Sequence, residues 1–419
     1  MTDATAIGAS RASGFHRFLV ATGMNTFGDV VSTIALPVIA FTLLGANAFE
    51  VAALVAAEQA AWLAVGLPVG VWVDRWSRKR VIVAGGLLRG ALLATIPLAW
   101  WAGVLSLPQL FIVAAATGVV AVFTTTANTA YLPSLVPHDE LLSANGKLAT
   151  VSTATDTAGQ AVAGIIVQIF RAPFAIAIEA VLAIASAILV QTTKEKERVL
   201  LDEDSPATFW RQMVEGVRYT LGHPTFRTIL ATNLAWNVAM AGQFAIAVPF
   251  LLEVVDVDEA AIGIAFAVGG LGGLIGAMAV GRLSRKYGSG AVWRASLVLG
   301  PIFGLLAPLA ALFPGLVGAA LYGLGTGVLG AAIAMVSVIT GAARQAICPP
   351  HLLGRLGAVS QFISWGIIPV GALLFGALGS WIGLQGAMWA TGITFFLCVI
   401  VARFSTLWRS RSIEVELTG

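Results

Sequence analysis

Five charged side chains lie inside long apolar stretches of the chain, where titratable groups are rare and usually functional. They are four acids and one base: Asp29, Glu58, Asp156, Glu179 and Arg89. A charge at the centre of a bilayer costs at least ~2.5–3.5 kcal/mol, so such residues often mark proton or substrate pathways. A carboxyl group removed from water can exchange a proton near neutral pH. We therefore expect Asp29 and one of the other acids to carry a coupling proton or bind cationic cargo.

A buried ion pair is the alternative explanation for these charges. Arg89 is the base available within a predicted span, so we expect it to be the charge partner of one acid. Asp29 has the strongest case for transport, because it lies near mid-depth and shares a helical face with Asn25 and Ser32. Asp156 instead shares its face with small residues, which is typical of helix packing or of a cavity. Two glycines of that span are predicted packing positions: Gly159 and Gly164.

The composition sets the class of protein. The chain has 419 residues, of which 58% are hydrophobic and 11% charged, with a mean hydropathy of +0.90. Soluble domains are typically ~25% charged, so this composition indicates an all-α polytopic membrane protein. The apolar runs predict twelve transmembrane helices at 16–44, 50–73, 81–103, 108–132, 147–170, 173–192, 226–252, 260–280, 291–312, 316–342, 356–379 and 386–404.

The basic residues predict the orientation of these helices. With the N-terminus inside, all of the 24 Lys and Arg except Arg171 and Arg89 fall in cytoplasmic segments. This bias predicts a multi-pass protein of the plasma (inner) membrane with both termini cytoplasmic and no cleavable signal peptide. The pI of about 9.1 is then explained by anchoring to the bilayer, so we expect no nucleic-acid partner.

Two loops repeat one another. Residues 74–79 read Asp-Arg-Trp-Ser-Arg-Lys and residues 281–286 read Gly-Arg-Leu-Ser-Arg-Lys, with Arg75 and Arg282 207 positions apart. Chance similarity of basic loops is the alternative, but four identities at one offset favour an internal repeat. We expect six-helix bundles at 1–193 and 226–419, joined by a cytoplasmic linker at 194–225 that contains an amphipathic helix.

The first of these loops resembles the signature of the major facilitator superfamily. The matching residues of the stretch 70–80 are Gly70, Asp74, Arg75, Arg78 and Lys79. The resemblance implies two pseudo-symmetric six-helix bundles that rock about a central substrate site, with this motif as a gating latch. A positive-inside anchor is the simpler explanation of the same basic residues.

Four further stretches resemble the drug:proton antiporter-3 branch of that superfamily. They are Gly28-Asp29 with Ala35-Leu-Pro37, Arg89, Leu132-Pro-Ser-Leu-Val-Pro137 with Leu142-Ser-Ala-Asn145, and Glu215-Gly-Val-Arg-Tyr219 with Pro224-Thr-Phe-Arg227. Two features depart from other proton-coupled drug exporters. Residues 108–132 contain no arginine, and the span-five glycine-proline signature occurs as Gly159-Gln-Ala-Val-Ala-Gly164 without the proline.

The second half offers amide and aromatic side chains in place of mid-span acids. The predicted cavity residues, with Asn25 of the first half, are Asn233, Trp236, Asn237, Gln243, Gln361 and Trp365. Such a wall suits amphipathic or cationic organic molecules, although ordinary interhelical hydrogen bonding would explain the same residues. Four glycines of span eight, Gly269, Gly272, Gly273 and Gly276, are expected to pack helices together.

These observations predict a monomeric secondary transporter, embedded in the lipid bilayer, that exports hydrophobic or amphipathic small organic molecules in exchange for protons. A lipid or lysolipid flippase and a dedicated siderophore or antibiotic exporter are the alternatives within transport. A membrane sensor or scaffold would not need mid-span acids. No nucleophile–base pair or metal-ligand cluster is evident, so we expect neither an enzyme nor a cofactor other than the proton.

Overall fold

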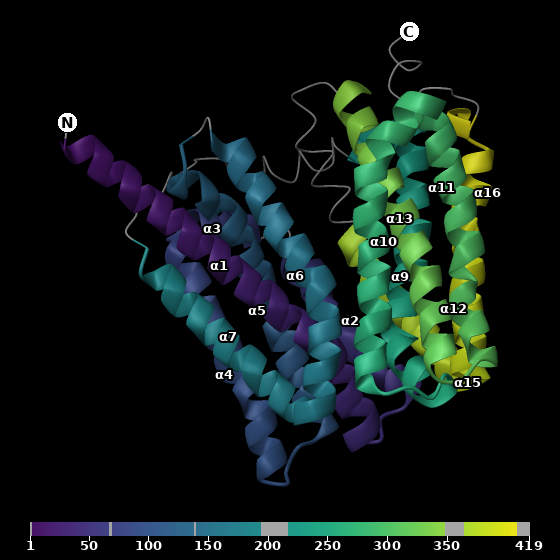
Figure 1. The fold of residues 1–419 in the computed structure, drawn as a ribbon, viewed down its shortest axis with the longest axis horizontal. Coiled ribbons are helices and arrows are strands. Elements are labelled where there is room, and N and C mark those ends of the chain that lie inside the picture. The colour runs from purple at the N-terminus through teal and green to yellow at the C-terminus, as the bar shows by residue number, and fades with distance from the viewer. Residues whose placement is uncertain (1, 67–68, 138–139, 194–216, 348–363, 409–419) are drawn as a thin grey trace. The chain divides into compact units, whose positions relative to one another are not determined.

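The computed structural model describes residues 2–66, 69–137, 140–193, 217–347 and 364–408, and these residues contain helices but no strands (Figure 1). The first part of the chain forms α1 (Thr2–Val38), α2 (Ala48–Val65), α3 (Val69–Arg75), α4 (Arg78–Trp101), α5 (Leu107–Leu135), α6 (Leu141–Phe170) and α7 (Ala172–Gln191). The second part forms α9 (Pro224–Pro249), α10 (Glu259–Tyr287), α11 (Ser289–Gly304), α12 (Leu306–Leu309), α13 (Leu316–Ile347), α15 (Ile368–Thr394) and α16 (Leu397–Arg403).

The predicted membrane class and the twelve helices are confirmed. Ten described segments are long and apolar enough to cross a membrane. One of them, Ser364–Arg403, is interrupted at Gly383, whose φ of 82° and ψ of 159° are not helical, so it supplies two helices. The 30-residue α6 is long enough to be the twelfth span but more polar, because it carries Asn145, Lys147 and Asp156.

Two compact units divide the chain, which we call the first unit and the second unit. The first comprises Met1–Ala46 and Ala57–Glu203, and the second Asn47–Ala56 and Asp204–Gly419. The predicted boundaries at 1–193 and 226–419 therefore differ at residues 47–56. Most of the predicted linker and amphipathic helix lies outside the described residues, although residues 217–222 are helical.

Each unit contains a long helix of the same construction, α1 in the first and α9 in the second. In α1, Pro37 precedes a π-helical turn at Ile39–Leu43, and in α9, Pro249 precedes a π-helical turn at Phe250–Val254. Proline removes a backbone hydrogen bond from the helix interior, which favours such a local widening. The shared feature adds a structural parallel to the repeated basic loops.

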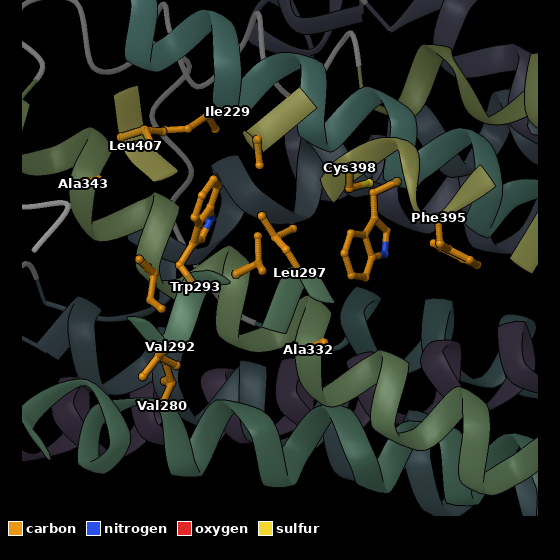
Figure 2. Packing of buried hydrophobic residues seen from close by; sticks show 14 of the residues in the cluster. Ile229, Val280, Val292, Trp293, Leu297, Ala332, Ala343, Phe395, Cys398 and Leu407 are labelled. Atoms are coloured by element: carbon orange, nitrogen blue, oxygen red, sulfur yellow. The ribbon is translucent and has the colours of Figure 1, made fainter. Parts of the chain in front are cut away.

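Glycines allow the helices of each unit to pack closely. In the second unit, a Cβ on Gly272 would lie 1.9 Å from the carbonyl oxygen of Gly327, and one on Gly276 would lie 2.4 Å from that of Ala331. The predicted packing role of these glycines is confirmed, since α10 contacts α13 through them. Figure 2 shows the apolar core of this unit, where Trp293, Leu297 and Cys398 lie among buried side chains.

Candidate functional site

A charge cluster in the first unit is built from three helices. Arg89 of α4 forms ion pairs with Asp29 of α1 and with Glu179 of α7, where Nη2 lies 2.6 Å from Oε1 of Glu179. The side chain of Asp29 is 53% exposed, whereas those of Arg89 and Glu179 are 15% and 1% exposed. The cluster is therefore closed at α7 and accessible at α1. The structure brings together three residues that lie 60 to 150 positions apart in the sequence.

The buried carboxylate of Glu179 is held by two donors from two different helices. The hydroxyl of Ser32 donates to Oε2, while the guanidinium of Arg89 donates to Oε1. A buried carboxylate needs such donors, because an unpaired charge away from water costs several kcal/mol. Gly28 makes room for this arrangement, since a Cβ at position 28 would lie 2.9 Å from Cγ of Glu179.

Two glycines on α4 bring Arg89 within reach of α7. A Cβ on Gly86 would lie 2.9 Å from Cβ of Ala187, and a Cβ on Gly90 would lie 2.5 Å from Cγ1 of Ile184. Sequence reasoning missed Gly28, Gly86 and Gly90 as positioning residues. Two of these glycines could have been recognised from the sequence, because Gly28 directly precedes Asp29 and Gly90 directly follows Arg89.

Glu58 of α2 belongs to the same electrostatic environment. Its carboxyl group interacts with the charges of Arg89 and Asp29. The backbone of Glu58 lies against α5, where a Cβ on Gly118 would be 2.1 Å from the Glu58 carbonyl oxygen. Within the described residues, Nε of Arg89 is buried and has no hydrogen-bond partner. The guanidinium therefore keeps one donor that its acid partners do not use.

The cluster carries more acid than base. One guanidinium faces the carboxyl groups of Asp29, Glu179 and Glu58, so full ionisation leaves an excess of two negative charges. Neighbouring like charges repel one another, and a counter-ion lowers the energy of holding them together. A proton or an organic cation can supply the missing charge. Among the described residues, no group of three or more His, Cys, Asp or Glu is arranged to hold a metal ion.

Two other predicted residues lie beside the cluster. Asn25 of α1 accepts a hydrogen bond from the hydroxyl of Ser186 on α7, at 2.8 Å, so it joins two helices of the site. Asp156 of α6 is exposed and forms a side-chain hydrogen bond with Gln160 one turn away. Its carboxyl group also interacts electrostatically with Asp29. Among the described residues no base forms an ion pair with Asp156, so it is a peripheral acid.

The predicted packing glycines of α6 lie on its inner side. A Cβ on Gly159 would be 3.1 Å from Cδ2 of Phe27 on α1, which is close contact between the two helices. Gly164 is also buried. This side of α6 therefore packs on α1.

Two residues of the predicted cavity wall of the second unit, Trp236 and Gln243, are buried in the structure. Trp236 is 6% exposed and lies in the apolar core, edge to face with Phe395 at a ring separation of 5.6 Å. The ring of Trp236 is buried in the apolar core because burial of an indole stabilises the fold more than its exposure does.

The other predicted wall residues have varied surroundings. Gln243 is 4% exposed, and the amide of Asn237 donates to the carbonyl oxygen of Asn233 on its own helix. Trp365 is 39% exposed, whereas Gln361 lies outside the described residues.

A lysine of the predicted gating motif binds the C-terminal end of α7. Lys79 donates to the carbonyl oxygen of Thr193, and Arg17 of α1 donates to that of Thr192 at 2.7 Å. Cations at a helix C-terminus satisfy its free carbonyl groups and its dipole. Arg75 is exposed and Arg78 partly buried, while the side chains of Gly70 and Asp74 lie outside the described residues.

Comparison with known proteins decides the family. The sequence profile of the Major Facilitator Superfamily matches residues 18–364. The chain belongs to this superfamily. The match spans both units, and the all-helical fold of two six-helix halves agrees with it.

Solved structures show the same fold at low sequence identity. The nucleoside transporter NupG is 13% identical, with a TM-score of 0.75 over 95% of this chain and 99% of that one. A bacterial homologue of the human lysosomal transporter Spinster, in an inward-facing and occupied conformation, is 15% identical, with a TM-score of 0.71 over 94% and 97% of the chains. A bacterial homologue of the iron transporter ferroportin is 17% identical, with a TM-score of 0.71 over 93% and 97%. The search of curated proteins gave no match.

The superfamily and the fold identify an integral membrane protein and indicate a transporter rather than an enzyme. Identities this low establish the fold alone, so the cargo of these neighbours does not transfer to this chain. The branch resemblance to drug:proton antiporters stays a prediction.

Proposed function

We propose that this superfamily member is a proton-coupled exporter of amphipathic, preferably cationic, organic molecules. The observation that carries the proposal is the cluster of one guanidinium and three carboxyl groups in the first unit. A site with excess acid binds a proton when cargo is absent and releases it when a cationic cargo arrives. Exchange of one positive charge for another at the same acids is the elementary step of antiport.

The two paired acids have different parts in this step. Asp29 is half exposed, so it is the group that meets cationic cargo and the aqueous phase. Glu179 is sealed and held by Ser32 and Arg89, so it is the group that keeps a proton or passes it to Asp29. Arg89 bonds to both and can shift its ion pair toward whichever acid is ionised. Rocking of the two bundles about a central site, as expected for this superfamily, then exposes the cluster to each side in turn.

The membrane and orientation follow from the charge bias. We place the protein in the plasma membrane as a monomer with both termini in the cytoplasm, since nearly all Lys and Arg then lie inside. A lipid flippase or a dedicated siderophore or antibiotic exporter would use the same fold with a neutral, zwitterionic or anionic cargo. The acidic cluster favours a cation over these.

The test is counter-transport in proteoliposomes that contain the full chain. A lipophilic dye cation such as ethidium is supplied outside, and an entrapped pH-sensitive dye reports protons. An acidic interior should drive dye uptake and raise the internal pH. We expect Asp29→Asn to lower dye uptake and proton movement together by at least tenfold, because the ion exchanged at this acid is lost.

Two further variants sharpen this experiment. Glu179→Gln should allow dye exchange down its own gradient while removing the response to the imposed pH gradient. Glu253→Gln changes an exposed acid far from the cluster in sequence and should behave like the parent chain. Dye uptake by the parent that ignores the pH gradient would contradict proton coupling, and parental behaviour of Asp29→Asn would remove that acid from the mechanism.

A further inference from the structure

A groove of about 590 Å³ lies in the first unit between the end of α3, the first turns of α4, and α5. Its end near the start of α4 is basic, with Arg75 and Arg80, and it continues over apolar side chains to Leu88. Leu88 lies eight positions after Arg80, or ~12 Å along a helix, which takes the groove from the membrane boundary into hydrocarbon depth. A basic end joined to an apolar channel suits a ligand that is anionic at one end and apolar at the other.

The two arginines are available to a ligand. Both are exposed, and among the described residues neither guanidinium has an ion-pair or hydrogen-bond partner in the protein. Lys79 of the same segment behaves differently, since it donates to the carbonyl oxygen of Thr193 at the end of α7. Among the residues whose side chains the structure describes, no acid lines the groove. The charge of this described lining is therefore complementary to a phosphate.

The rings of Trp76 and Phe123 form one wall of the groove, and Trp72 stacks beside them. Phe123 of α5 stacks on Trp72 at a ring separation of 5.9 Å and on Trp76 at 6.0 Å, with interplanar angles of 7° and 16°. Trp72 and Trp76 are 40% and 52% exposed. Tryptophan is enriched at the level of lipid headgroups, where its ring is apolar and its N–H is polar. The wall thus marks the boundary between headgroup and acyl chain.

The second unit contains an equivalent groove that lacks the charge. Its volume is about 430 Å³, and it lies between α10, α11 and α13. The residues that lie 207 positions after lining residues Trp76, Arg80, Ala84, Gly85 and Leu88 also line this second groove: Leu283, Tyr287, Ala291, Val292 and Ala295. Among the described residues, no Lys or Arg lines the second groove. The fold therefore explains the hollow in both units. It does not explain Arg80, whose counterpart is Tyr287, or why Arg75 lines its groove whereas its counterpart Arg282 does not.

We propose that the groove of the first unit binds one anionic phospholipid. Arg75 and Arg80 bind the phosphate of the headgroup, and an acyl chain lies along Phe123 and Leu88. A zwitterionic lipid fits the apolar part but brings its own cation to the arginines, so it binds more weakly. This site differs from the charge cluster of Asp29, Arg89 and Glu179 and does not depend on the proposed transport function.

The test is native mass spectrometry of the full chain in detergent, titrated with phosphatidylglycerol or with phosphatidylcholine of the same acyl chains. We expect tighter binding of one phosphatidylglycerol. A basic residue near an anionic headgroup contributes about fivefold in affinity, so Arg75→Gln or Arg80→Gln should each weaken it about fivefold, and the double variant about 25-fold. The matched control is Arg282→Gln with Arg285→Gln in the repeated loop, which removes two exposed arginines outside either groove and should leave that binding unchanged.

A second pair of variants tests the apolar part without altering charge. Leu88→Trp fills the charged groove, and Ala295→Trp fills the equivalent position of the uncharged one; both residues are exposed, so both variants should fold. Thermal unfolding of each variant checks this. We expect Leu88→Trp to lower phosphatidylglycerol binding several-fold and Ala295→Trp to leave it unchanged. Three results would each overturn the proposal. They are equal binding of the two lipids, an equal loss of phosphatidylglycerol affinity in the two double arginine variants, and undiminished phosphatidylglycerol binding by folded Leu88→Trp.

Discussion

At the scale of the residue, Arg89 links two acids that differ in exposure. Its ion pairs with Asp29 and Glu179 join an accessible carboxylate to a sealed one, and Glu58 adds a third charge nearby. The sequence allowed prediction of these residues, because charges are rare and costly inside apolar spans. It did not allow prediction of which acids meet Arg89. That choice depends on how α1, α4 and α7 are rotated about their axes, and hydropathy does not report this rotation.

Removal of the base tests how the cluster is balanced. In Arg89→Gln the carboxylates of Asp29 and Glu179 lose their counter-charge, and breaking a buried pair from one side costs about 3–5 kcal/mol. We expect a lower unfolding temperature at pH 8 and partial recovery at pH 5, because the orphaned acids bind protons more readily at low pH in the folded state. The measurement is thermal unfolding in detergent at both pH values.

The double variant Arg89→Gln with Glu179→Gln provides the control for this prediction. It removes the sealed acid together with the base, so it should be more stable at pH 8 than Arg89→Gln alone. An Arg89→Gln variant that unfolds at the same temperature as the parent at both pH values would show that the ion pairs do not stabilise the fold.

At the scale of the element, small residues rather than large ones decide where the helices meet. The spans could be predicted from apolar runs because each must cross ~30 Å of hydrocarbon. The position of Trp236 could not be predicted from the sequence, because a lipid-facing surface, a cavity and an apolar core can all accommodate an indole ring. Its place beside Phe395 depends on how the turn between α15 and α16 approaches α9, more than 140 residues away in sequence. The glycines of α4 illustrate the same limit, because their partners on α7 are known only from the fold.

Enlargement of one glycine should disrupt the cluster without touching a charge. In Gly90→Val the new side chain meets Cγ1 of Ile184 at 2.5 Å and the carbonyl oxygen of Ala180 at 2.9 Å, so α4 must move away from α7. Overpacking of this kind typically costs about 1–3 kcal/mol. We expect a lower unfolding temperature and at least tenfold slower proton-coupled dye uptake.

The control for Gly90→Val lies next to it in the sequence. Ala91 is exposed on the same helix, so Ala91→Val adds apolar surface away from α7 and should behave like the parent in both assays. If Gly90→Val transports at the parental rate, close packing of α4 on α7 is not needed to position Arg89.

At the scale of the whole molecule, two similar halves have acquired different chemistry. Both carry the repeated basic loop, a proline followed by a π-helical turn in the first long helix, and a groove at equivalent positions. The mid-span acids and Arg80 belong to the first unit only, whereas Arg75 has a counterpart in Arg282 of the second unit, which does not line the groove there. The sequence predicted the repeat from four identities in one loop, because that loop kept its charges in both copies. The grooves could not be predicted, since they are formed by side chains from separate helices.

The charge bias of the whole chain predicts which ends of the helices face the cytoplasm, and cysteine labelling can test this. Ser106 lies between α4 and α5 on the predicted outer side, and Arg285 lies at the opposite end of the topology; both are exposed. In a Cys348→Ser background, Ser106→Cys should react with a membrane-impermeant maleimide in intact cells. Arg285→Cys should react only after permeabilisation, because positively charged loops are retained inside. Cys398 is buried, so the background itself should stay unlabelled. The reverse labelling pattern would invert the topology, and with it the direction in which the acid cluster exchanges protons for cargo.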